Sequence, residues 1–192
     1  NDIIKYSCNV GVIESMKALK KKDLHDTLAK FRFGIRSGLD LPGELSGILP
    51  SREWKLAQYH QPWYPGETVI SGIGQGYNVV TPLQLAVAVA AIANGGRRFA
   101  PRLLYASKQA GNQQATRQHA PEVLQSPVVS EQDWDTVREG MRRVVHGAAG
   151  TARALQPLNG YEMGGKSGTA QVIGQAQGKD YEESHTAVNL RH

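Results

Sequence analysis

The sequence of 192 residues contains a single cysteine, Cys8, so no disulfide can form within the chain. This excludes the disulfide-stapled scaffolds of small secreted proteins and leaves the redox compartment open. Long hydrophobic runs are also missing: the longest apolar stretch, residues 83–93, would span about 17 Å as a helix, whereas a bilayer core is about 30 Å thick. We therefore expect no transmembrane helix in this sequence. A chain of this length buries about 70% of its unfolded surface, which suffices for one domain, or part of one, without a structural metal.

Signatures of metal and nucleic-acid binding are absent as well. The six histidines form no H-E-x-x-H motif and no close Cys/His pair, so we expect no metal site. The formal net charge is +5, which could suit an anionic partner. The basic residues, however, occur in short runs near predicted helix ends, without interleaved aromatic residues. This pattern is typical of a solvated surface, and we expect no nucleic-acid partner.

Two stretches near the start, residues 9–19 and 23–31, carry apolar residues at the three-and-four spacing of a helical face. We expect a helix over each stretch, with Gly34 ending the second. Glycine and proline are then frequent over residues 34–76, in groups such as Trp63-Tyr64-Pro65-Gly66. We interpret this region as a long loop of turns and extended connectors, of the kind that often carries function.

A strong helix start occurs at Thr81-Pro82. Thr81 is a preferred N-cap, Pro82 suits the first helical position, and Gln84 lies three residues after the cap, as in a capping box. We expect a helix over residues 82–93, ended by Asn94-Gly95-Gly96. Because these residues are apolar on nearly all sides, we expect other elements to enclose the helix.

Three further elements are expected after this helix. Residues 106–121 are rich in Gln and Asn, and we interpret them as a polar loop. Ser130 with Asp133 predicts the start of an amphipathic helix that Gly147 ends. Residues 163–173 predict a strand, and their glycines suggest that another group approaches its backbone closely.

The sharpest local motif is residues 160–167, which satisfy the pattern G-x-x-x-x-G-K-[S/T] of a phosphate-binding loop. Such a loop needs a hydrophobic strand before it and a helix after it. Residues 155–159 are not typical of a strand, residues 169–173 are typical of a strand rather than a helix, and no apolar run ends in an Asp that could hold magnesium. A nucleotide-binding protein is therefore an alternative that the context does not favour.

The same region contains a K-S-G-T element, similar to the K-T-G element of acyl-transfer enzymes that react with penicillin. Lys166 would supply positive potential, and Ser167 and Thr169 would offer hydroxyls to a carboxylate. Gly168 would let an extended substrate lie against the edge of the strand. The predicted strand is the context that this element requires.

A second short motif, Ser7-Cys8-Asn9, stands at the start of the first predicted helix. Taken alone, an S-x-N pattern means little, because Asn9 could be an ordinary N-cap beside a small buried Cys8. The S-x-N motif becomes specific only together with two other blocks of the sequence. Three blocks occur in one order along the chain: Tyr6-Ser7-Cys8-Asn9-Val10, Thr81-Pro82-Leu83-Gln84 and Lys166-Ser167-Gly168-Thr169-Ala170-Gln171-Val172.

With these blocks in this order, nearly the whole chain resembles the transpeptidase domain of class B penicillin-binding proteins. Residues 49–54 and 63–68 resemble penicillin-binding protein 2, the elongation enzyme, more than the division enzyme. The resemblance implies an α/β (α+β) fold, in which helices flank a mostly antiparallel sheet and a helical subdomain borders the groove. Residues 1–192 would form one partial transpeptidase domain.

The resemblance also implies the site. The implied catalytic residues are Ser7, Asn9 and Lys166, and the implied substrate-binding residues are Ser167, Gly168 and Thr169. Ser7 would pass a proton within a Ser/Lys network that Lys166 tunes, and Asn9 would hydrogen-bond a substrate amide. Ser167 and Thr169 would bind a carboxylate, with the Thr169 N–H as one donor of the oxyanion hole.

The implied activity is a two-step acyl transfer without cofactor or metal. A serine attacks a D-Ala-D-Ala stem peptide of peptidoglycan, D-Ala leaves, and the acyl group passes to an amine of another stem. A β-lactam would mimic the first step and stay attached. The implied partners are a glycosyltransferase and cell-wall elongation proteins. The domain would face the periplasm or cell exterior, with a membrane anchor upstream of Asn1.

One departure from the family pattern is large. The family nucleophile lies in S-x-x-K, and no Ser of this sequence has Lys three residues later; the nearest pattern, Thr27-Leu28-Ala29-Lys30, lies after Ser7 on an ordinary amphipathic helix. We expect the nucleophile upstream of Asn1 and further strands after Arg191-His192, so that the 192 residues alone are catalytically silent. A non-catalytic sensor or scaffold that kept the groove is the alternative.

Overall fold

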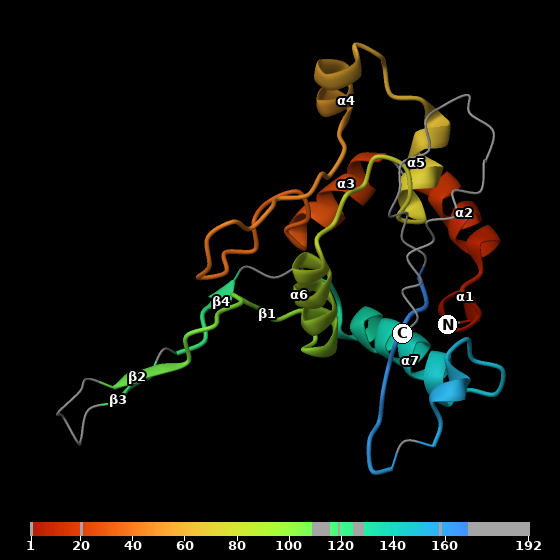
Figure 1. Cartoon of the computed structure of the whole chain (residues 1–192). Coiled ribbons are helices and arrows are strands. Elements are labelled where there is room, and N and C mark those ends of the chain that lie inside the picture. The colour runs from red at the N-terminus through yellow and green to blue at the C-terminus, as the bar shows by residue number, and fades with distance from the viewer. Residues whose placement is uncertain are drawn as a thin grey trace, which may run out of the picture.

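A computed structural model of the chain describes residues 2–19, 21–108, 116–118, 120–124, 129–157 and 159–168 (Figure 1). The helices are α1 (Asp2–Lys5), α2 (Asn9–Ala18), α3 (Lys21–Lys30), α4 (Arg52–Tyr59), α5 (Pro65–Gly72), α6 (Pro82–Ala93) and α7 (Glu131–His146), followed by a 3-10 turn η1 (Arg153–Leu155). The strands are β1 (Arg98–Phe99), β2 (Ala106–Lys108), β3 (Thr116–Gln118) and β4 (Val123–Leu124). Within these ranges, no helix is long and apolar enough to cross a membrane.

The first two predicted helices are confirmed as α2 and α3. A shorter helix, α1, precedes them and packs against α7 (Figure 1). The two helices approach closely at Gly140 of α7, where an added Cβ would lie 2.8 Å from Cδ1 of Ile4. This close approach fixes where the turn after α1 lies relative to α7.

The prediction of one long loop over residues 34–76 is wrong, because two helices of eight residues, α4 and α5, lie within it. The residue types that begin these helices, Ser and Pro, are also common in turns. Ser51 caps α4 by accepting a hydrogen bond from the Trp54 backbone N–H at 3.0 Å. The Glu67 carboxylate accepts from the Tyr64 N–H at 2.7 Å at the start of α5, where Pro65 occupies the first helical position.

A buried ion pair joins α4 to α5. The Lys55 side chain is 1% exposed, and its ammonium donates to the carboxylate of Glu67. The ammonium also lies over the ring of Tyr64, 4.4 Å from the centroid, and 5.9 Å from that of Tyr77. Tyr77 in turn contacts the ring of Trp54 on α4, at a centroid distance of 5.4 Å. The buried ammonium of Lys55 thus contacts both α5 and the aromatic rings beside α4, and it holds these two helices together.

The predicted start of α6 is confirmed by a reciprocal capping box. The Gln84 N–H donates to Thr81 Oγ1 at 3.1 Å, and the Thr81 N–H donates to Gln84 Oε1 at 3.0 Å. The enclosure predicted for this helix is wrong. Its Ala88 and Ala91 are buried, but Leu85 is 55% exposed. Among the described helices and strands, β1 and α7 make the main contacts with α6, and they leave Leu85 uncovered.

The central packing involves α1, α6 and α7, and it buries Trp134, Val144 and Val145 of α7. The predicted limits of α7 are confirmed: Ser130 Oγ accepts from the Asp133 N–H at 3.2 Å, and the helix ends at Gly147. The ring of Trp134 meets Phe31 edge-on, with centroids 6.2 Å apart, and so brings the end of α3 to this core.

The described strands form two antiparallel pairs, β1 with β4 and β2 with β3. The β2–β3 hairpin extends away from the helices (Figure 1). The prediction of a polar loop over residues 106–121 is therefore wrong for the two strands. In β2, none of the three residues is buried, so its sequence need not alternate between apolar and polar residues. Residues 163–168 of the strand predicted over 163–173 are not in a strand, and residues 169–173 lie outside the described residues.

Candidate functional site

The S-x-N motif forms the turn between α1 and α2. Ser7 takes a left-handed backbone conformation, with φ of 52°, and the Cys8 N–H donates to the carbonyl of Ile3 at 3.0 Å. This turn lets α2 begin at Asn9, which is exposed. The N-cap is Cys8 rather than Asn9, because the thiol sulfur accepts from the Gly11 N–H at 3.4 Å.

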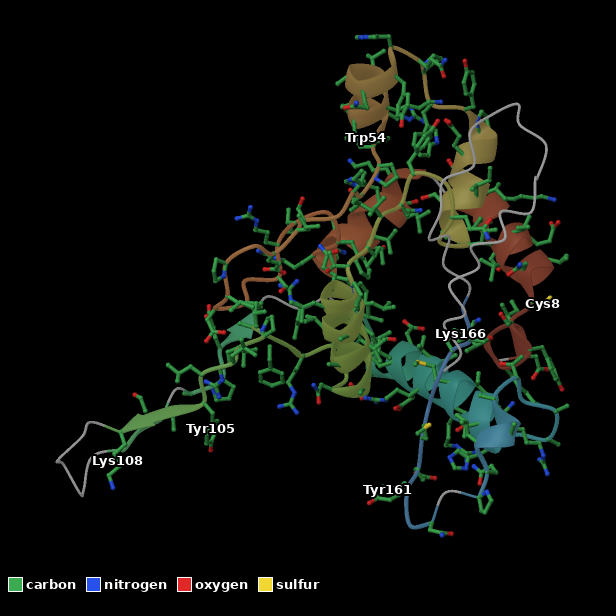
Figure 2. All side chains as sticks on the ribbon, in the orientation of Figure 1. Cys8, Trp54, Tyr105, Lys108, Tyr161 and Lys166 are labelled. Atoms are coloured by element: carbon green, nitrogen blue, oxygen red, sulfur yellow. The ribbon has the colours of Figure 1, made fainter. Side chains whose placement is uncertain are left out.

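The expectation of a buried filler at Cys8 is wrong as well, since its thiol is exposed. Figure 2 shows Cys8 at the right-hand edge of the molecule, with Lys166 nearer the centre of the view. The turn directs the side chains of these two adjacent residues differently. Ser7 Oγ accepts from the ammonium of Lys166, while the Cys8 sulfur accepts from the Gly11 N–H in the first turn of α2.

The segment that carries the K-S-G residues runs along α7. The Met163 N–H donates to Nε2 of His146 at 3.1 Å, and the Gly165 N–H donates to the carbonyl of Met141 at 3.0 Å. The backbone donor at Met163 requires that Nε2 of the imidazole be unprotonated. Two hydrogen bonds that this segment donates to α7 therefore fix the backbone immediately before Lys166.

Lys166 meets Ser7 at this point. Its Nζ donates to Ser7 Oγ at 2.7 Å, between residues 159 positions apart, and also donates to the carbonyl oxygen of Ser167 at 2.6 Å. A lysine ammonium has donors only, so the Ser7 oxygen accepts from it and the Ser7 proton stays free for another acceptor. Two of the three blocks that carry the family resemblance are thus joined by one hydrogen bond.

Thr151 belongs to the site although no sequence motif indicated it. Its Oγ1 lies 3.3 Å from Ser167 Oγ, and its N–H donates to the carbonyl of Lys5 at 3.4 Å. The available signal was the Gly- and Ala-rich turn directly after α7, in which Gly150 packs tightly against the helix end. A lone threonine after such a turn carries no recognisable pattern.

The structure therefore brings together some of the predicted site residues but not all of them. Ser7, Lys166 and Ser167 come together, and Asn9 begins the helix two residues after Ser7. Gly168 follows directly, and an added Cβ there would meet nothing within 4 Å among the described residues. Thr169 lies outside the described residues.

The electrostatic character of the site is positive. Lys166 donates to two neutral oxygens, and Lys5, whose carbonyl binds Thr151, donates its ammonium to the hydroxyl of Tyr6 at 2.8 Å. Over the described ranges, neither ammonium is within salt-bridge distance of a carboxylate. Such a site suits an anionic ligand. The described part of the chain holds no group of three or more His, Cys, Asp and Glu that could bind a metal.

A separate depression of about 440 Å³ lies between α2 and α5, away from these residues. Met16, Trp63 and Val69 are among its lining residues, and Lys17 and Arg52 also line it. None of Ser7, Lys166 and Ser167 lines it. The chemistry of the site is therefore not located in this cavity but on the surface where α1, α7 and the 159–168 segment meet.

Residues 1–189 match the family of the penicillin binding protein transpeptidase domain, and the chain belongs to this family. Its relatives include the peptidoglycan D,D-transpeptidase MrdA of Acinetobacter baumannii, which is 40% identical over 162 residues, covering 84% of this chain and 23% of that protein. The chain thus spans about a quarter of the length of this curated relative.

Two solved structures have folds similar to that of this chain. Penicillin-binding protein 2 of Pseudomonas aeruginosa in complex with WCK 5153 has a TM-score of 0.76 and 39% identity, covering 88% of this chain and 38% of that one. Penicillin-binding protein 2 of Helicobacter pylori in complex with MreC has a TM-score of 0.74 and 31% identity, covering 89% and 30%. The resemblance to penicillin-binding protein 2 is confirmed, and the nucleotide-binding alternative is not favoured.

Proposed function

We propose that the protein is a peptidoglycan D,D-transpeptidase of the penicillin-binding protein 2 type, and that these residues form part of its active site. The observation that carries the proposal is the 2.7 Å hydrogen bond from Lys166 Nζ to Ser7 Oγ. It unites the S-x-N and K-S-G elements, which are far apart in the sequence. An acyl-transfer site needs such a constellation, because a positioned hydroxyl must move a proton while a cation stabilises negative charge.

Ser7 and Lys166 have distinct roles in this proposal. Lys166 donates to Ser7 Oγ and holds that hydroxyl in one orientation, so the Ser7 proton points away from the ammonium. When the D-Ala amine leaves the tetrahedral intermediate, Ser7 gives this proton to its nitrogen, and the proton is replaced through the Ser/Lys network. The positive charge of Lys166 lowers the cost of negative charge on the reacting groups.

The substrate-binding roles follow from the same arrangement. Ser167 offers a hydroxyl to the terminal carboxylate of the stem peptide. No described atom lies within 4 Å of a Cβ placed at Gly168, and the glycine would let the peptide lie along the backbone. Asn9, exposed at the start of α2, would hydrogen-bond a substrate amide. Thr169 would contribute a second hydroxyl and an N–H donor for the oxyanion.

The attacking serine is not among these residues in our proposal, because no Ser of the sequence has Lys three residues later. The parent protein would supply that pair, and the 192 residues alone would be silent. A membrane anchor would hold the parent with this domain facing the periplasm or cell exterior. A glycosyltransferase and elongation proteins would be its partners, in line with the similarity to a penicillin-binding protein 2 that was solved with MreC. The non-catalytic scaffold is not favoured, since the matched relative is named a D,D-transpeptidase.

Intact-mass spectrometry of the parent protein after incubation with a penicillin tests the proposal. We expect a stoichiometric mass gain for the unmodified parent and a strongly reduced rate of gain for Ser7→Ala and Lys166→Ala. Lys22→Ala removes an exposed lysine of α3 and is the matched control. No mass gain on a folded parent would overturn the proposal, and a penicilloyl adduct on the 192 residues alone would show that they contain the nucleophile.

A further inference from the structure

Thr151 touches both halves of the site without belonging to either motif. Its backbone N–H donates to the carbonyl of Lys5, two residues before Ser7, at 3.4 Å. Its hydroxyl lies 3.3 Å from that of Ser167. It is exposed on the surface where a ligand of Ser167 would bind. A side chain in this place can influence how Ser167 presents its hydroxyl.

The backbone around Thr151 is held firmly to the end of α7. The Gly150 N–H donates to the carbonyl of Gly147 and the Ala152 N–H to that of Val144, both at 3.0 Å. A Cβ added at Gly150 would lie 2.3 Å from the Val144 carbonyl oxygen, so only glycine fits against the helix end there. Thr151 is thus presented from a rigid turn, which is what a positioning side chain needs.

The direction of the Thr151–Ser167 hydrogen bond follows from the ligand that Ser167 must bind. Each hydroxyl has one proton, and an ionised carboxylate only accepts hydrogen bonds. If Ser167 gave its proton to Thr151, it would present only lone pairs to the carboxylate. If Thr151 donates instead, the Ser167 proton is free for the ligand, and the two bonds in series strengthen each other.

We propose that Thr151 is a positioning residue that donates to Ser167 Oγ and thereby makes this site selective for ligands with a free terminal carboxylate. This inference rests on the proposed function and adds a residue to its substrate-binding part. Lys166 cannot replace Thr151 in this role, because its ammonium donates to the carbonyl oxygen of Ser167 and not to the hydroxyl.

Acylation rates of the parent protein with a penicillin and with its methyl ester test the proposal. Thr151→Val keeps the shape of the side chain and removes the donor. We expect it to slow acylation by the free acid about tenfold, the scale of one hydrogen bond, and to leave the rate with the ester unchanged. Thr151→Ser should rescue the preference for the acid, and Thr136→Val, a change at an exposed site on α7, is the matched control.

A double-variant experiment separates positioning from direct binding. Because Thr151 acts through Ser167, Thr151→Val should cause no further loss of acid preference in a Ser167→Ala background. An unchanged acid preference in Thr151→Val, or equal losses for acid and ester, would overturn this inference alone. Absence of any adduct on the folded, unmodified parent would instead overturn the proposed function. If the valine variant does not fold, Thr151→Ala takes its place in the same comparison.

Discussion

Ser7 accepts a hydrogen bond from Lys166 while its own backbone is left-handed, with φ of 52°. For a residue with a side chain, this conformation costs about 1 kcal/mol or more relative to the right-handed regions. Glycine would avoid that cost but would have no hydroxyl. The turn between α1 and α2 therefore keeps a locally unfavourable residue at the point where the side chain meets the ammonium of Lys166.

Ser7→Gly and Ser7→Ala separate the backbone effect from the hydroxyl effect. Both remove the acceptor of Lys166, so both should slow acylation of the parent protein by at least about tenfold. Only alanine keeps the backbone cost, so the glycine variant should be more stable by about 1 kcal/mol. Thermal unfolding and penicillin acylation measure the two effects. Equal stability of the two variants would contradict the left-handed turn, and a normal rate in either would contradict the role of the hydroxyl.

The buried ion pair of Lys55 and Glu67 should dominate the stability of the α4–α5 region. Lys55→Met leaves the Glu67 carboxylate without its cation at a site where the lysine is 1% exposed. We expect a loss of about 3 kcal/mol in the free energy of unfolding, and a smaller loss when Glu67→Gln is added. Urea denaturation measures both.

Lys17→Met is the matched control for this experiment, because its ion pair with Glu14 is exposed, at 60% for each side chain. It should change stability by less than about 1 kcal/mol. A Lys55→Met variant as stable as this control would show that the pair contributes little.

Gln84 should contribute strongly to stability, because it connects α6 to the loops that precede it. It is 2% exposed, and its Nε2 donates to the carbonyls of Ile35 and Ser46, at 2.7 and 2.8 Å. Gln84→Leu leaves both carbonyls without this donor and removes one half of the capping box, so we expect a loss of about 3 kcal/mol in the free energy of unfolding. Leu85→Ala, at the neighbouring exposed position, should cost much less. Similar losses for the two variants would contradict this role.

Asp40 binds the backbone just before β2 through its carboxylate, and this interaction should depend on pH. The backbone N–H of Leu103 donates to its carboxylate at 2.7 Å and that of Leu104 at 3.1 Å. These two hydrogen bonds lower the pKa of the Asp40 carboxyl below its usual value. The stabilisation is therefore complete above the pKa of the unfolded chain and is lost as the pH falls through the lowered pKa of the folded chain.

Hydrogen-exchange protection factors of the Leu103 and Leu104 amides measure this interaction. We expect protection that persists through the ordinary titration range of a carboxyl group, near pH 4, and declines only at lower pH. Asp40→Asn offers one acceptor oxygen instead of two, so at least one amide should lose protection at neutral pH. Asp26→Asn on α3 is the control. Protection that is equal in Asp40→Asn and the unmodified chain would contradict the interaction.

Helix starts could be predicted where a cap precedes a long apolar pattern, and they were missed where the helix is short. Thr81 and Ser130 cap helices of 12 and 16 residues, and both starts are confirmed. Ser51 and Pro65 begin helices of only eight residues. In about two turns, the apolar pattern repeats too few times to distinguish a capped helix from a Pro- and Gly-rich loop. The residues at the start do not help, because helix caps and turns use the same residue types.

The candidate site was predictable in its chemistry but not in its full membership. Ser7 and Lys166 belong to motifs whose residue types and order can be recognised in a sequence. Thr151 belongs to no motif, and only its distance of 3.3 Å to Ser167 assigns it to the site. The exposed thiol of Cys8 likewise depends on the turn geometry, which a small apolar-like residue type does not reveal.

The family, the order of the S-x-N and K-S-G elements, and the long helices can all be predicted from the amino-acid sequence, because they depend on residue types at fixed short spacings. Which side chains meet depends instead on packing between segments that are far apart in the sequence. Lys166 reaches Ser7 because α1 packs against α7 at Gly140 and because α7 holds the backbone of Gly165 through the Met141 carbonyl. That contact joins residues 159 positions apart, and no local propensity acts over such a distance.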